Sequence, residues 1–190
     1  MDPVTHAAVA YLLYVAYAAV TTRRLPARWA LVPVAVGSQF PDLIDKPLAY
    51  WGVLAYGRSL AHSVFSLVIV CGMVWWMLRS DTVPCGDLLP DQLCRVAPAA
   101  FTIGYAAHLL GDAWRGLLSG DFVSVRFLVY PVFGVPRSSS DNIAPWVRIL
   151  EIYQDPVAAV HIEIVLIALV VFVSVRLWAA WRGWWPEGRL

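Results

Sequence analysis

The sequence has little charge, and lysine is almost missing from it. Charged residues make up 14% of the 190 residues, where about 25% is usual in soluble domains. Lys46 is the only lysine, and the net charge is +1, so no electrostatic feature favours nucleic acid as a partner. Hydrophobic residues instead make up 60% of the chain, and the mean hydropathy is +0.66. The composition therefore predicts an integral membrane protein and argues against a nucleic-acid-binding one.

Cysteine is also scarce. Cys71 falls within an apolar segment, while Cys85 and Cys94 flank a polar loop without the close paired spacing of a zinc ribbon. Their spacing predicts neither a thiolate metal site nor a disulfide. The first residues carry no basic stretch and no cleavage motif, so no removable signal peptide is expected, and the sequence shows no internal repeat.

Five apolar segments approach the length of about 20 residues that a helix needs to cross a bilayer. They cover residues 4–20, 29–40, 60–78, 96–117 and 157–178. Segment 29–40 is short, so it either crosses or forms a re-entrant half-helix, and we expect it to cross. Segments 48–56 and 123–135 are too short to span and are expected at the membrane interface, the second as a lid. The sequence thus predicts an all-α, polytopic transmembrane bundle that forms a single domain over residues 1–190.

The arginines orient this predicted bundle. Arg23, Arg24 and Arg28 form the densest basic cluster, which the positive-inside rule assigns to the cytoplasm, with the N-terminus outside. Five crossings then bring all four histidines to the extracytoplasmic half, together with four acidic residues. These are His6, His62, His108 and His161, with Asp42, Asp45, Asp112 and Glu163. Ionisable residues within membrane segments are functional candidates, and their gathering at one end favours a common polar centre.

His108 and Asp112 are the core of this prediction. Their spacing of four residues puts both side chains on one face of a helix. Burying them in a membrane is costly, and a divalent metal would stabilise both; a hydrogen-bonded contact between helices is the alternative. Asp and His ligands suit zinc, and manganese or iron are possible. The number of candidate ligands suggests two ions, or one ion and a general base.

Four motifs occur in order along the chain: Thr5-His6, Pro41-Asp42-x-x-Asp45, Arg58-Ser-x-x-His62-Ser63 and Gly104-Tyr-x-x-His108-x-x-x-Asp112. Together they resemble the YdjM-like family of membrane-bound metal-dependent hydrolases, and their order is distantly similar to zinc-dependent phospholipase C. The resemblance implies that Asp42, His62, His108 and Asp112 bind one metal ion, and that His6 binds a second one bridged by Asp112. His161 and Glu163 are possible additional ligands, although a helix would point them about 200° apart.

The predicted activity is hydrolysis of a phospholipid or a lipid-linked phosphoester by a metal-activated water. Asp45 is expected to accept the proton, and Arg58 to bind a phosphate, or else simply to meet lipid head groups. The first alternative is a proton- or metal-ion-coupled transporter that uses the same cluster, although no inverted repeat supports it. The second is a purely structural membrane protein. The sequence predicts no oligomeric state.

Overall fold

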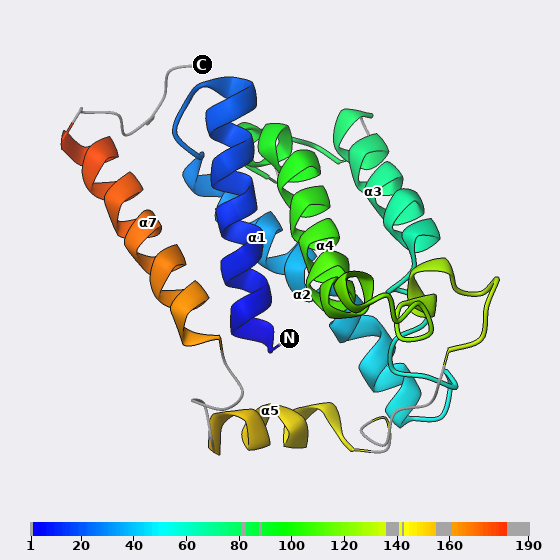
Figure 1. Ribbon diagram of the computed structural model, residues 1–190. Helices are drawn as coiled ribbons and strands as arrows, with labels where there is room; N and C mark the ends of the chain where they lie inside the picture. The colour runs from blue at the N-terminus through cyan, green and yellow to red at the C-terminus, as the bar shows by residue number, and fades with distance from the viewer. Residues whose placement is uncertain are drawn as a thin grey trace.

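The computed structural model describes residues 2–80, 83–87, 89–135, 141, 143–154 and 161–181. These residues form helices and no strand. Figure 1 shows five helices side by side with a sixth across one end of them. The five are α1 (Pro3–Tyr17), α2 (Leu31–Tyr50), α3 (Val64–Arg79), α4 (Asp91–Ser119) and α7 (Ile162–Trp181), and the sixth is α5 (Pro145–Gln154). The predicted all-α transmembrane bundle is confirmed.

Three of the helices are long and apolar enough to span a membrane. They are α1 together with the π-helical turn η1 (Ala18–Thr22), α4 and α7. α3 is apolar but has only 16 residues. α1 begins at Pro3, and its N-cap is Asp2, whose side chain accepts a hydrogen bond from the Thr5 amide at 2.9 Å. This start puts His6 one turn into the helix.

α2 differs from its prediction. The helix runs through Pro41 and Pro47 to Tyr50, so it does not end near residue 40, and it takes in the first three residues of the predicted segment 48–56. Prolines are tolerated inside membrane helices because neighbouring groups can satisfy the backbone that they leave free. As a result Asp42 and Asp45 lie on consecutive turns of one helix, at a spacing that places them on the same side.

α2 and α4 pack more closely than side chains would normally allow. A Cβ atom on Gly37 would overlap the Phe101 carbonyl, and one on Gly104 would overlap the Val34 carbonyl and lie 2.9 Å from the Ser38 amide. Only glycine permits this approach of the two backbones. The crossing places the α2 carboxylates beside the α4 histidine.

The segment between α2 and α3 is not helical where the sequence predicted a helix. α3 begins at Val64, and Ser63 is its N-cap, accepting a hydrogen bond from the Ser66 amide at 3.1 Å. Arg58 and His62 therefore lie in a turn and not in the first turn of a span. The Tyr105 hydroxyl of α4 donates to the Ala61 carbonyl at 2.5 Å and fastens this turn to the bundle.

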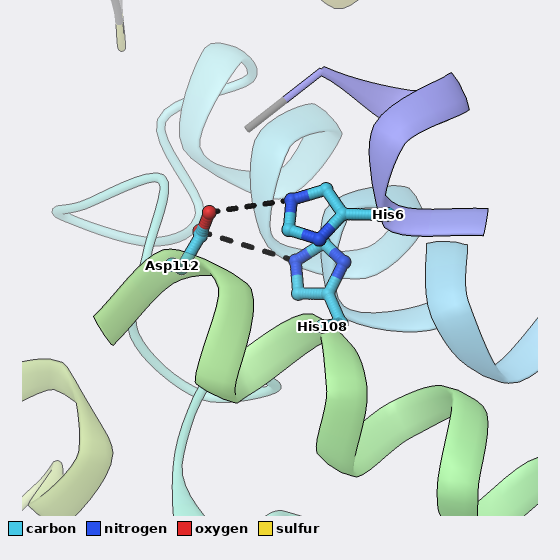
Figure 2. Close-up of side chains that lie close together, drawn as sticks. All are labelled: His6, His108 and Asp112. Atoms are coloured by element: carbon cyan, nitrogen blue, oxygen red, sulfur yellow. Dashed lines mark ion pairs between the residues drawn. The ribbon is translucent and has the colours of Figure 1, made fainter. Parts of the chain in front are cut away.

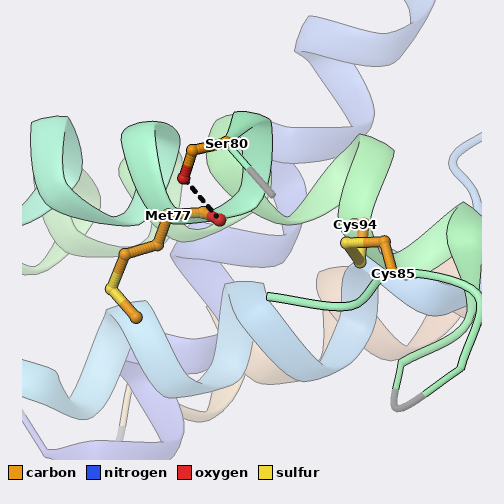
Figure 3. Close-up of a disulfide and its surroundings, with 4 residues drawn as sticks. All are labelled: Met77, Ser80, Cys85 and Cys94. Atoms are coloured by element: carbon orange, nitrogen blue, oxygen red, sulfur yellow. Dashed lines mark hydrogen bonds between the residues drawn. A yellow bond between two sulfur atoms is a disulfide. The ribbon is translucent and has the colours of Figure 1, made fainter. Parts of the chain in front are cut away.

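The structure contains a disulfide that the spacing of the cysteines does not predict. Cys85 and Cys94 form this bond, shown in Figure 3, which joins the loop after α3 to the first turn of α4. Cys71 is the free cysteine in the described part of the chain. The bond depends on how the loop folds back onto α4, and the spacing of the two cysteines does not reveal this. The disulfide lies at the end of the bundle opposite α5 (Figure 1).

Candidate metal centre

The turn that carries His62 is anchored by Asp45. One oxygen of this buried carboxylate accepts the Ala61 amide at 2.9 Å. The other accepts the Ser59 amide at 2.8 Å, the His62 amide at 3.2 Å and the His62 ring Nδ1 at 2.8 Å. Both oxygens are fully engaged by donors. The prediction that Asp45 accepts a proton from water does not fit these contacts, and its role in the structure is to position His62.

His62 is held so that its other ring nitrogen faces α4. Because Nδ1 donates to Asp45, Nε2 is left for a ligand, and it lies 3.3 Å from Asp42 Oδ1. His62 has no exposed surface. Burial lowers the pKa of His62, but the carboxylates of Asp42 and Asp45 beside its ring outweigh burial and hold the pKa above its usual value.

His108 is oriented in the same manner by the backbone of α2. Its Nδ1 donates to the Ser38 carbonyl at 2.6 Å, which leaves Nε2 facing the cluster. The close crossing of α2 and α4 makes this bond possible, because it brings a main-chain carbonyl within reach of a side chain on the other helix. The Nε2 atoms of His62 and His108 then lie 3.3 Å apart.

Asp42, His62 and His108 form a three-ligand group with the spacing of a metal site. Asp42 Oδ1 lies 3.3 Å from the Nε2 atom of His62 and 3.7 Å from that of His108. Ligand atoms at about 2.0–2.1 Å from a tetrahedral zinc ion are roughly 3.3 Å from one another. Asp112 Oδ2 lies 3.7 Å and 4.0 Å from the same two nitrogens and can serve as the fourth ligand. The geometry can therefore bind a metal ion.

The polarity of this group suits a cation. The two Nδ1 atoms are held by Asp45 and the Ser38 carbonyl, so the Nε2 atoms of His62 and His108 face each other and the Asp42 carboxylate. Asp42 Oδ1 is buried and has no hydrogen-bond partner. Buried acceptors that face one another without a donor are costly, and either a metal ion or added protons would satisfy them.

A second group shares two of these residues. Figure 2 shows His6 from α1 stacked on the His108 ring, with centroids 4.0 Å apart, and Asp112 beside both. His6 Nε2 lies 3.3 Å from Asp112 Oδ1, and neither ring nitrogen of His6 has a hydrogen-bond partner. Asp112 thus presents one oxygen to each group, as a carboxylate that bridges two ions does. This arrangement agrees with the roles that the family resemblance implies for His6 and Asp112.

Two basic side chains border the cluster. Arg58 Nε lies 2.9 Å from Asp112 Oδ2, and 46% of the Arg58 side chain is exposed. Arg58 reaches the centre from the turn before α3. Lys46 forms an ion pair with the Oδ2 atom of Asp42. Phe127, in the 3₁₀ helix η3 (Arg126–Val129), packs edge-on against His62 and under Arg58. The predicted segment 123–135 therefore does cover this centre.

The two possible additional ligands lie apart from the centre. His161 and Glu163 stand at the start of α7, where His161 Nδ1 is 3.6 Å from Glu163 Oε1. The Glu163 side chain is 71% exposed, and neither residue belongs to a metal-binding group of the described residues. Their contact with the bundle is through the His161 amide, which donates to Thr5 Oγ1 at 3.3 Å.

Sequence reasoning missed the residues that orient the ligands. Ser38 acts through its main-chain carbonyl, which carries no sequence signal. Phe127 is one apolar residue among many in an interfacial segment. Lys46 was within reach of prediction, because it follows Asp42 by four residues and such pairs meet on a helix. Tyr105 stands in one of the four motifs, and its partner is the main-chain carbonyl of Ala61, an unspecified position of another motif.

Comparison with known proteins identifies the family. The family model described as YdjM inner membrane protein matches residues 1–185. The chain belongs to this family. No curated protein and no solved structure matches it. Membership in YdjM confirms the resemblance seen in the four motifs and agrees with an inner-membrane location, and it names no activity.

Proposed function

We propose that this YdjM protein is a membrane-embedded, metal-dependent hydrolase. The observation that carries the proposal is a pair of overlapping ligand groups, Asp42 with His62 and His108, and His6 with His108 and Asp112, each spaced as ligands of one ion. Zinc fits nitrogen and carboxylate ligands in this number, and His6 with the second Asp112 oxygen marks a place for a further ion. A divalent ion held there lowers the pKa of a coordinated water and so supplies a nucleophile at neutral pH.

The substrate class that fits this centre is a phosphoester of a lipid or a lipid-linked molecule. Arg58 uses Nε for Asp112, which leaves the two terminal nitrogens of its half-exposed guanidinium for an anionic group. A guanidinium that binds a phosphate and a nearby carboxylate at once positions the phosphate beside the ligands. The centre also lies near one end of membrane-spanning helices, where lipid head groups are found (Figure 1).

The transporter reading has less support. A transport path needs polar groups that continue from the cluster to the other end of the bundle. The core beyond His108 toward that end is apolar, and it consists of Ala10, Tyr14, Ala30, Val34, Ala100 and Ala107. Such a core insulates the centre from the opposite membrane face. A purely structural role leaves the buried acceptors unexplained.

The orientation that we propose is the reverse of the one predicted from Arg23, Arg24 and Arg28. Charge separates the two orientations only weakly, because Lys46, Arg58, Arg115, Arg126 and Arg148 belong to elements at the end with the centre, against six described arginines at the other end. The disulfide supports the reverse. At about 1.5 Å per residue, α4 separates Cys94 from Asp112 by roughly 27 Å, close to the thickness of the hydrocarbon layer. Disulfides persist in oxidising compartments, so we propose that the metal centre opens toward the cytoplasmic leaflet.

The first experiment is a metal analysis of the purified protein by elemental mass spectrometry. We expect one or two divalent ions per chain in the native protein, and loss of this metal in the double variant His108→Ala, Asp112→Ala. The matched control is His161→Ala, Glu163→Gln, which removes a histidine and a carboxylate outside the cluster and should keep the metal. Native protein that stays metal-free after incubation with zinc would overturn the proposal.

Activity is tested on the metal-loaded protein with short-chain phosphodiester and phosphomonoester lipids. Asp112→Asn should retain the fold, measured by helical circular dichroism, and lose turnover, because an amide is a poor metal ligand. A variant that keeps full turnover would show that hydrolysis does not depend on this centre.

A further inference from the structure

α5 has an apolar stripe that the described part of the protein leaves largely exposed. Trp146, Ile149, Leu150 and Tyr153 follow the i, i+3, i+4, i+7 spacing of one helix face. All four are exposed, Leu150 by 62% and Trp146 by 55%. The contact of α5 with the bundle is made with α2, where the Trp146 ring meets the Tyr50 ring at 5.4 Å. An exposed apolar stripe of this kind fits an apolar partner.

The position of α5 identifies the partner. Figure 1 shows α5 lying across the end of the bundle, roughly perpendicular to α1 and α7, at the level where α7 begins. α7 is apolar and exposed on nearly all sides, with Leu166, Ile167 and Val170 each more than half exposed, as expected of a span surrounded by lipid. A short helix joined to the start of such a span, and perpendicular to it, lies in the plane of the membrane surface.

The side of α5 opposite the stripe carries Arg148 and Glu151. Arg148 and Pro145 line a shallow recess together with Lys46, Gly57 and Asp141. Lys46 pairs with the metal-ligand candidate Asp42, and Gly57 precedes Arg58. Two basic side chains, Lys46 and Arg148, thus border the recess beside the centre.

We propose that α5 is an interfacial membrane helix that binds the phospholipid surface next to the metal centre. Its stripe of Trp146, Ile149, Leu150 and Tyr153 enters the boundary between head groups and acyl chains, and Arg148 lies at the level of the lipid phosphates. Tryptophan and tyrosine favour that depth because their rings are apolar and carry one polar atom. One consequence rests on the proposed hydrolase function: a lipid substrate would reach the centre laterally, from the leaflet in which α5 lies.

The test measures the depth of α5 directly and needs no activity. In a Cys71→Ala background, Leu150→Cys and Glu151→Cys are each labelled with a small fluorophore and reconstituted in phosphatidylglycerol–phosphatidylcholine vesicles. We expect lipids with a nitroxide high on the acyl chain to quench the label at 150 severalfold more than the label at 151, and aqueous iodide to show the opposite order. Glu151 is the matched control because it lies on the polar side of the same helix.

Labels at both positions that respond to iodide alone would overturn the proposal, since α5 would then lie in water. The proposal would also be overturned if a second copy of the protein carrying a nitroxide quenched the labels at 150 and 151 equally while the nitroxide lipids quenched neither. That result would identify a protein partner. The metal content of the same two variants is measured in parallel. Failure of the hydrolase proposal would appear there as missing metal, independently of the depth of α5.

Discussion

Asp45 and His62 act as one unit within the centre. Asp45 receives four hydrogen bonds from the turn, and one of them fixes which His62 nitrogen faces the metal position. An acidic residue that orients a histidine ligand raises its basicity and fixes its ring, and replacing such a partner typically lowers metal affinity by about 10–100-fold. The sequence indicated both residues, but the structure reverses the expected role of Asp45 from proton acceptor to positioning residue.

Replacing Asp45 by Asn should weaken metal binding without removing a ligand. An amide retains one acceptor and loses the charge that stabilises the His62 imidazole, so we expect zinc affinity to fall by about 10–100-fold. Competition titration with a fluorescent zinc chelator measures this change. Ser59→Ala is the control, because Asp45 binds the main-chain amide of residue 59 and not its side chain. Unchanged affinity in Asp45→Asn would contradict the positioning role.

Metal binding should depend on pH through His62. Its pKa in the folded, metal-free protein is raised above the ordinary value of about 6.5, so His62 stays protonated to a higher pH than a free histidine. The proton competes with the metal for the ring, and affinity should therefore fall as the pH drops through and below this raised pKa. Zinc titrations between about pH 5 and pH 9 measure the midpoint. A midpoint below about 6.5 would contradict the raised pKa.

At the scale of helices, the crossing of α2 and α4 builds the centre. Gly37 and Gly104 let the two backbones approach, and the same approach brings the Ser38 carbonyl to His108. Helix packing and ligand orientation therefore depend on the same two glycines. A change that separates the helices should affect stability and metal binding together.

Gly104→Ala tests this dependence. The added Cβ would meet the Val34 carbonyl and the Ser38 amide, which are backbone atoms that cannot rotate away. We expect a destabilisation of about 1–3 kcal/mol, the usual cost of overpacking, and weaker zinc binding. Thermal unfolding in detergent and zinc titration give the two readouts. Gly72→Ala in α3, where nothing lies within 4 Å of the new atom, is the control and should lower neither stability nor zinc binding.

At the scale of the whole molecule, the two ends of the bundle differ in chemistry. One end holds the metal-ligand candidates and α5, and the other holds the disulfide (Figures 1 and 3). The compartment at each end decides which substrates can reach the centre. The proposed orientation places the disulfide on the outer side of the membrane. It concerns the entire chain and is therefore tested on intact cells.

Thiol labelling of intact cells tests the orientation. In a Cys71→Ala background, we expect a membrane-impermeant maleimide to label Cys85 and Cys94 from outside, and only after reduction. A second probe, Leu118→Cys at the exposed end of α4, should be labelled only after the membrane is permeabilised. The reverse pattern, with free thiols that react only from inside, would restore the orientation that Arg23, Arg24 and Arg28 predicted.

Several features of this protein were determined by the sequence alone. The runs of apolar residues predict membrane helices, because no water is available there to satisfy a backbone in any other form. The spacing of His108 and Asp112 places both on one face of α4, because the helix has 3.6 residues per turn. The ordered motifs predicted the family, and they named His6, Asp42, His62, His108 and Asp112, which the structure brings together.

The tertiary structure decided what those residues do. Asp45 could be recognised as a site residue, but only the fold shows that a turn from 58 to 62 fills both of its oxygens. His161 and Glu163 match the chemistry of ligands, yet the start of α7 places them outside the cluster. The disulfide and the Ser38 carbonyl were equally beyond the sequence. The bond from His108 to Ser38 joins two helices that are far apart in the sequence, and the disulfide requires a loop to fold back onto α4. Residue type and local spacing do not predict such contacts.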